Sequence, residues 1–141
     1  MNYKRAIGIG ILVYLVTMIL GMIVCSILGI TPDPSMMEPI PPAMWLTSAV
    51  LAIFLSIAGA FWYFRGKGLQ ANTKQGARFG LALVLTGFVL DLLFFLSLSF
   101  QNYSPVAAIK NYYGQPPFWL TLILILIGAT GVGHYLASKK K

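Results

Sequence analysis

The chain has 141 residues, of which 58% are hydrophobic and 9% are charged, and its formal net charge is +7. A typical soluble domain carries about 25% charged residues, so this composition excludes an ordinary water-soluble domain of the same size. The basic residues stand in short runs between apolar blocks, which is typical of membrane topology signals and not of nucleic-acid binding. We therefore expect an integral membrane protein with no nucleic-acid partner.

The first apolar block covers residues 6–30 and contains no charge, while Lys4 and Arg5 precede it. At a rise of about 1.5 Å per residue it can cross a hydrocarbon core of about 30 Å. The block is longer than the roughly 7–15 residues of a signal-peptide core. No A-x-A cleavage site follows, and Ile23-Val24 precede Cys25 where a lipoprotein site has a small residue. We expect a retained transmembrane helix.

Three further apolar blocks predict transmembrane helices at residues 43–64, 79–100 and 117–138. Proline pairs at 41–42 and 116–117 stand at the starts of two of them, and proline suits the first turn of a helix. The predicted fold is an all-α integral membrane protein, a single domain over residues 1–141. Its architecture is a four-helix transmembrane bundle of up-down-up-down connectivity.

The polar segments between the blocks carry no recognisable cofactor site. Met36 and Met37, with Met44 just inside the second block, are soft ligands, but no cysteine or histidine joins them, so we expect no metal. The Arg-Gly-Lys-Gly sequence that begins at Arg65 lacks the Walker pattern, so we expect no phosphate-binding loop. Residues 101–116 are predicted to be an outer loop with tyrosines as interfacial anchors.

The distribution of basic residues predicts the orientation of the bundle. With a cytoplasmic N-terminus, nine bases lie on the inner side and one, Lys110, on the outer side. The nine are Lys4, Arg5, Arg65, Lys67, Lys74, Arg78, Lys139, Lys140 and Lys141. The positive-inside rule therefore predicts that both termini are cytoplasmic and that the basic inner face contacts anionic lipids.

The second and fourth blocks begin alike, with Pro-Pro-Ala-Met-Trp-Leu-Thr from Pro41 and Pro-Pro-Phe-Trp-Leu-Thr from Pro116. One interpretation is a duplication of two helical hairpins, residues 1–73 and 74–141. The alternative is that prolines start helices and tryptophans occupy interfaces regardless of ancestry. The first and third blocks align poorly, because Thr17 would fall on Asp91.

Small residues at helical spacing predict the faces on which the helices pack closely. These residues are Ser48, Ala52, Ser56 and Ala60 in the second block, Gly80 and Gly87 in the third, and Gly128, Gly131 and Gly133 in the fourth.

Asp91 is the only charged residue within the four blocks. Gly80 and Gly87 share its helical face, so we expect the carboxyl to point into the bundle. Matching depths in the membrane predicts Thr17, Cys25 and Ser56 as its neighbours. Two interpretations remain open. In one, Asp91 couples proton or cation movement; in the other, its carboxyl ties two helices together by hydrogen bonding.

The sequence does not predict an enzyme, because no acid–base pair, catalytic triad or metal cluster is recognisable. In size and number of spans the chain is similar to small multidrug-resistance transporters. Those carry an essential glutamate in the first span, whereas residues 6–30 contain no acid, so no family is assigned.

We expect a multi-pass protein of the cell membrane, or of the cytoplasmic membrane in a prokaryote. The favoured function is a non-catalytic accessory bundle that interacts with lipid or with a partner. The alternative is a small oligomeric transporter or channel-like protein that uses Asp91 for proton or cation coupling. The expected partners are the bilayer and either a second copy of the chain or another membrane protein.

Overall fold

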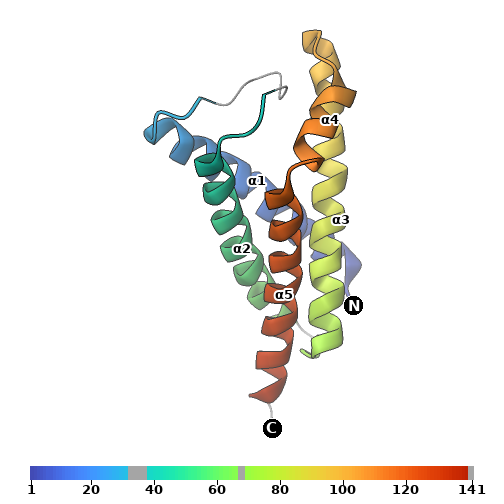
Figure 1. Cartoon of the computed structure of the whole chain (residues 1–141). Helices are drawn as coiled ribbons and strands as arrows, with labels where there is room; N and C mark the ends of the chain where they lie inside the picture. Colours follow the sequence, from blue (N-terminus) through green and yellow to red (C-terminus); the bar gives the residue numbers. More distant parts are fainter. Residues whose placement is uncertain (32–37, 67–68, 140–141) are drawn as a thin grey trace.

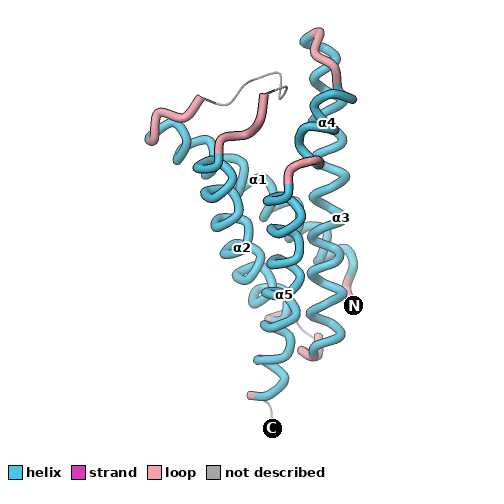
Figure 2. The backbone as a smooth tube through the Cα atoms, viewed as in Figure 1, coloured by secondary structure: helices cyan, strands magenta, loops and turns pink. Residues whose placement is uncertain are grey.

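The computed structural model describes residues 1–31, 38–66 and 69–139; Met36 and Met37 lie outside the described residues. Five α-helices make up this part of the chain, and the part contains no strand (Figure 2). The helices are α1 (Tyr3–Ile27), α2 (Pro42–Phe64), α3 (Thr73–Ser97), α4 (Pro105–Tyr113) and α5 (Pro116–Ser138), and the short 3-10 helix η1 (Leu98–Gln101) extends α3.

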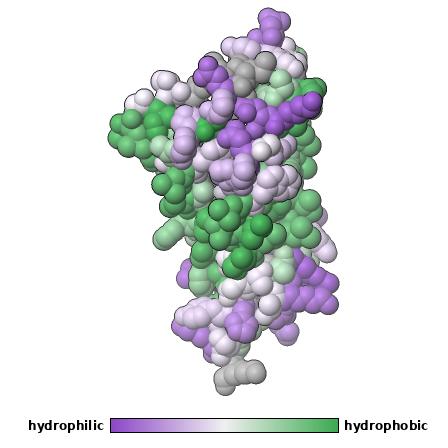
Figure 3. Space-filling model, in the orientation of Figure 1, coloured by the Kyte–Doolittle hydropathy of each residue, from purple (hydrophilic) through white to green (hydrophobic). Residues whose placement is uncertain are grey.

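Four of these helices, α1, α2, α3 with η1, and α5, are long and apolar enough to cross a membrane. The predicted all-α class with four such helices is therefore confirmed. Many of their large apolar side chains point away from the bundle, such as Phe54 and Ile127, which are 75% and 61% exposed. Figure 3 shows hydrophobic side chains over the middle of one face and hydrophilic ones mostly toward its two ends. This distribution suits a lipid environment.

Local caps move two helix starts away from the predicted positions. The Asn2 side chain accepts a hydrogen bond from the Arg5 backbone N–H at 3.1 Å, so α1 begins at Tyr3. The Asn72 side chain accepts from the Gln75 N–H at 2.8 Å, so α3 begins at Thr73, before the predicted start at residue 79. A cap satisfies backbone N–H groups that lack helical partners and so extends each helix into polar sequence.

The prediction that residues 101–116 form only a loop is wrong, because this segment contains α4. The Ser104 hydroxyl accepts a hydrogen bond from the Ala107 N–H at 3.4 Å, and Pro105 is the first helical residue. This pairing of a serine cap with a first-turn proline is a recognised helix start. The helix packs through the fully buried Ala108 against Phe95 and against Leu98 of η1.

The long helices form a ring in the order α1, α2, α5 and α3. Helix α3 packs along α5, α2 contacts both α1 and α5, and α1 closes the ring on α3. Helix α1 runs obliquely behind the others, from the α3 side to the far side of α2 (Figure 1). Residues of α1 between Gly10 and Met22 line a space inside this ring.

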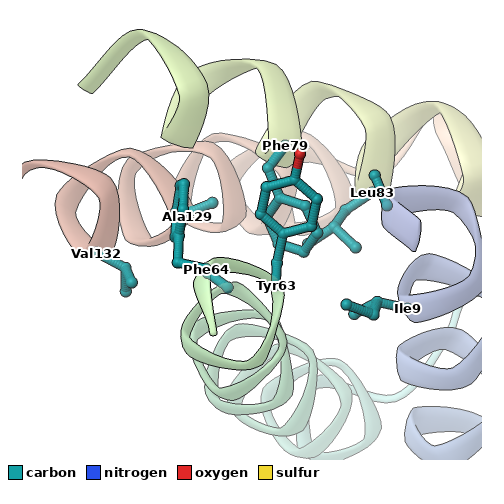
Figure 4. Packing of buried hydrophobic residues seen from close by; sticks show 9 residues of the cluster. Ile9, Tyr63, Phe64, Phe79, Leu83, Ala129 and Val132 are labelled. Atoms are coloured by element: carbon teal, nitrogen blue, oxygen red, sulfur yellow. The ribbon is translucent and has the colours of Figure 1, made fainter. Parts of the chain in front are cut away.

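The main core lies where α2 ends and α3 begins, and all four long helices contribute to it (Figure 4). The rings of Tyr63 and Phe79 stack with centroids 4.6 Å apart, and neither side chain is exposed. The Tyr63 hydroxyl accepts a hydrogen bond from the Asn2 N–H at 3.1 Å. Ile9 from α1 and Ala129 from α5 complete the cluster. This end of the bundle is therefore tightly closed.

Glycines allow α3 and α5 to approach most closely at the same end. A Cβ atom at Gly133 would lie 2.6 Å from the Asn72 carbonyl oxygen, and one at Gly76 would lie 2.6 Å from the Ala129 carbonyl oxygen. Both neighbours are backbone atoms that cannot move independently of their helices. Any larger side chain would therefore push the helices apart.

The predicted packing positions divide into two groups. Ala60 is fully buried in the core, Gly80 faces Ala129, and Gly128 faces Ile57. A Cβ atom at Gly87 or Gly131 would have nothing within 4 Å, so these two glycines do not support a close helix contact.

Candidate functional site

Asp91 is tied directly to helix α1. The Tyr14 hydroxyl donates a hydrogen bond to Asp91 Oδ1, with 2.7 Å between the two oxygens. Tyr14 lies in the middle of α1 and Asp91 lies in the third quarter of α3. A hydrogen bond to a carboxylate oxygen at this length is of the strong kind. It supplies one of the several partners that a buried carboxylate requires.

The two side chains border a cavity of about 380 Å³ between the four long helices. It extends from Gly10 and Ser56, beside the closed core, to Trp45 and Tyr112 near α4. This volume falls in the range of pockets that hold small molecules, roughly 300–1,000 Å³.

The wall of the cavity is mostly apolar and aromatic. Its aromatic lining residues are Tyr14, Trp45, Phe88, Phe94, Phe95, Tyr112 and Phe118. Asp91 is the only charged residue among the described residues that line it, so no lysine or arginine of the described chain neutralises it there. The arrangement combines one carboxyl, one phenol that binds it, and a surrounding set of aromatic rings.

A cluster of aromatic rings lines the end of the cavity near α4. Trp45 stacks on Tyr112 with ring centroids 5.4 Å apart, and its indole N–H donates to Gln115 Oε1 at 2.6 Å. The ring of Phe118 lies 5.1 Å from that of Tyr112. Gln115 precedes α5, so this bond joins the start of α2 to the start of α5.

The two tyrosines at the end of α4 lie within the electrostatic influence of Asp91. Burial and then the Asp91 charge raise the pKa of Tyr113 to about 12. Burial and then the same charge also raise the pKa of Tyr112 well above its ordinary value. Both phenols therefore keep their protons to a higher pH than an ordinary tyrosine does. The Tyr113 hydroxyl is buried near the carboxyl without meeting hydrogen-bond geometry to any described residue.

The structure brings some of the predicted neighbours of Asp91 to the cavity. Thr17 and Ser56 both line it, and the Thr17 hydroxyl donates to the Val13 carbonyl oxygen at 2.7 Å. Cys25 is buried, at 3% exposure, but it is not among the lining residues. Ser48 and Ala52, which were predicted to support close packing, face this space with Ser56.

Sequence reasoning missed Tyr14, the residue that touches Asp91. It treated tyrosines as interfacial anchors and looked for hydroxyl partners among threonine and serine. The available signal was position, because Tyr14 stands deep inside residues 6–30 and far from either end of that block. An interfacial tyrosine lies near the end of a span. A tyrosine at mid-span needs a polar partner for its hydroxyl.

No family model, curated protein or solved structure matches this chain. The helices and the cavity between them are therefore the basis for assigning a function.

Proposed function

We propose that this chain is a non-catalytic, multi-pass membrane protein that binds an amphipathic organic cation within the bilayer. One observation carries the proposal: the Asp91 carboxyl, bound by Tyr14, borders an aromatic-lined cavity inside the helix ring. In this function Asp91 supplies the counter-charge, Tyr14 orients the carboxyl, and the aromatic rings hold the apolar part of the ligand.

The argument from charge concerns what can neutralise Asp91. A carboxylate at membrane depth is costly unless it is paired. The Tyr14 hydroxyl stabilises the anion by hydrogen bonding but brings no positive charge. Since no basic residue of the described chain lines the cavity, a proton or a bound cation must provide it. An organic cation that enters from the membrane would replace the proton.

The argument from shape concerns the rest of the ligand. Aromatic faces attract cations, and the attraction is stronger where water is excluded. Trp45, Tyr112 and Phe118 present rings at the end of the cavity near α4, while Asp91 lies further along the same wall. A ligand that joins an ammonium group to an apolar body would satisfy both features. A simple metal ion would leave the aromatic wall unused.

Binding of two probes of equal shape tests the proposal. Phenyltrimethylammonium carries a permanent positive charge, and tert-butylbenzene is its uncharged carbon analogue. Thermal unfolding of the protein in nanodiscs would be followed at increasing concentrations of each probe. We expect phenyltrimethylammonium to stabilise the wild type more strongly, with Asp91→Asn weakening its binding by about tenfold or more. Glu38→Gln removes a carboxyl outside the cavity and should leave binding unchanged.

Three results would reject this function. Equal stabilisation by the charged and uncharged probes would show that the cavity binds apolar molecules with no preference for charge. Unchanged binding of phenyltrimethylammonium to Asp91→Asn would show that the Asp91 carboxyl does not contribute to recognition. Loss of binding in Glu38→Gln as well would show that the effect arises from the overall charge of the protein.

The arrangement in the membrane is part of the proposal. We place both termini in the cytoplasm and the four spans in up-down-up-down order, since nine of ten basic residues then lie on the inner side. In intact cells a membrane-impermeant maleimide should label Asn102→Cys and leave Ser138→Cys unlabelled. Labelling of Ser138→Cys but not of Asn102→Cys would show that the orientation is the opposite of the one proposed.

A second candidate function is proton- or cation-coupled transport by an oligomer of this chain. The observation that favours it is the Tyr14–Asp91 pair, because a proton on the Asp91 carboxyl can exchange with a cation that occupies the cavity, while the Tyr14 hydroxyl holds the carboxyl in place. Flux of phenyltrimethylammonium into proteoliposomes under an imposed pH gradient tests it. Flux that is equal in wild type and Asp91→Asn would exclude Asp91 from coupling. Binding without flux would exclude transport and would support only the non-catalytic binding function.

A further inference from the structure

A second hollow lies between α1 and α3, apart from the cavity that contains Asp91. It is a groove of about 450 Å³, and no residue lines both hollows. Ile7 and Ile11 of α1 form one wall, and Leu81, Leu85 and Val89 of α3 form the other. Tyr3 and Arg78 stand together at one end of the groove. The groove therefore has a long apolar part and a single charged end.

The walls of the groove face outward from the bundle. Ile7, Leu81, Leu85 and Val89 are each 47–57% exposed, as expected for side chains that meet lipid. Arg78 is also exposed and makes no hydrogen bond or ion pair with another described residue. Its charge is thus available to a group that reaches this end of the groove from the membrane surface.

The dimensions fit one leaflet of a bilayer. Arg78 and Val89 are separated by about 16 Å along the axis of α3, at about 1.5 Å per residue. Half of a hydrocarbon core of about 30 Å is roughly 15 Å. With Arg78 at the membrane–water interface, the apolar walls thus reach the bilayer midplane. Tyr3, at the same level, suits the headgroup region.

We propose that this groove binds one anionic phospholipid, with an acyl chain between α1 and α3 and the phosphate at Arg78. Charge complementarity selects a lipid over a peptide, because the groove offers one charged side chain, Arg78, at its end and apolar side chains along its length. The inference is independent of the proposed function, since it involves neither Asp91 nor the central cavity. It implies that the α1–α3 contact is strengthened by the surrounding anionic lipid.

Native mass spectrometry of the detergent-solubilised protein tests the proposal by counting retained lipids. We expect one long-chain phosphatidylglycerol to be retained per chain, about fivefold more tightly than phosphatidylcholine of the same acyl length. Arg78→Gln should abolish this preference. Arg65→Gln is the matched control, because Arg65 is an exposed arginine at the end of α2 and does not line the groove.

Three results would overturn it. The first is an unchanged phosphatidylglycerol preference in Arg78→Gln, and the second is an equal loss in Arg65→Gln, which would indicate a general surface charge effect. The third is equally tight binding of glycerophosphate or a short-chain phosphatidylglycerol, which would mean a phosphate site that does not use the groove.

A photoreactive phosphatidylglycerol with a diazirine on its acyl chain locates the lipid in nanodiscs. We expect cross-links to concentrate on peptides that contain Ile7, Ile11 and Leu85. Cross-links spread evenly over the exposed faces of α2 and α5 would mean unspecific contact and would also overturn the inference. A protein that fails the phenyltrimethylammonium test can still pass this one, so the two proposals fail separately.

Discussion

Tyr14 and Asp91 lie 77 positions apart in the chain, and their side chains hydrogen-bond at 2.7 Å across the contact between α1 and α3. The two members of the pair are not equivalent. The carboxyl needs donors, and the phenol needs an acceptor. Removing the phenol leaves a buried carboxyl short of a donor, whereas replacing the carboxyl by an amide keeps an acceptor and removes the charge. Variants of the two residues should therefore behave differently.

We predict that Tyr14→Phe destabilises the bundle by about 1–2 kcal/mol, because a buried carboxyl then lacks a donor. Asp91→Asn should be as stable as the wild type or more stable, since the amide oxygen can still accept from Tyr14 and no charge is buried. Unfolding in lipid nanodiscs measures both. The double variant should show clear non-additivity, above the average of about 0.6 kcal/mol for hydrogen bonds between membrane helices.

The opposite ranking would favour the purely structural interpretation of Asp91. If Asp91→Asn lost most of the stability and Tyr14→Phe lost none, the carboxyl would tie the helices together through groups other than Tyr14. Thr17→Val is a suitable control, because the Thr17 hydroxyl bonds within its own helix. Its stability should change little.

The sequence predicted the four apolar helices because their length and lack of charge leave few other arrangements. It did not predict that α3 starts at Thr73 or that 105–113 is helical, since both depend on short caps at Asn72 and Ser104. Cap signals of this kind are weaker than twenty apolar residues in a row. The duplication of the two hairpins stays a prediction.

The candidate site was predicted only in part. Asp91 stood out because a single charge inside an apolar span is costly. Its partner could not be derived, because helix tilt and rotation decide which residues meet, and α1 is strongly tilted (Figure 1). Depth alone pointed to Thr17, Ser56 and Cys25. The first two do line the cavity, but Tyr14 makes the hydrogen bond.

Two glycines on α5 provide a matched test of helix packing. Gly133→Ala should destabilise the bundle by about 1–3 kcal/mol, because the new methyl group would meet backbone atoms of Asn72 and Gly76 at 2.6 and 2.9 Å. Gly131→Ala should be neutral or stabilising by up to about 1 kcal/mol, since it has open space and alanine favours a helix. Thermal unfolding of both variants measures the difference, and equal effects would contradict the close α3–α5 contact.

Trp45 connects the starts of α2 and α5 and lines the cavity. Trp45→Phe removes the indole N–H that donates to Gln115 and part of the stacking on Tyr112. We expect a loss of about 1–3 kcal/mol and weaker binding of phenyltrimethylammonium. Trp62→Phe is the control, because Trp62 is 52% exposed and should cost no more than about 0.5 kcal/mol. Equal losses in both variants would mean that Trp45 has no special role.

The tyrosines of α4 predict how stability depends on alkaline pH. The pKa of Tyr113 rises from 10.0 to about 12 on folding. Between these values the unfolded chain has lost the phenol proton and the folded chain retains it. The contribution of Tyr113 to the free energy of unfolding is therefore fully present below about pH 10 and is lost as the pH rises toward 12.

Tyr113→Phe should flatten this part of the curve of unfolding free energy against pH, as measured by denaturant titration in detergent. Phe100→Leu, which changes an exposed side chain that carries no titratable group, should keep the wild-type slope. An unchanged slope in Tyr113→Phe would mean that this phenol is not held neutral by its burial and by Asp91.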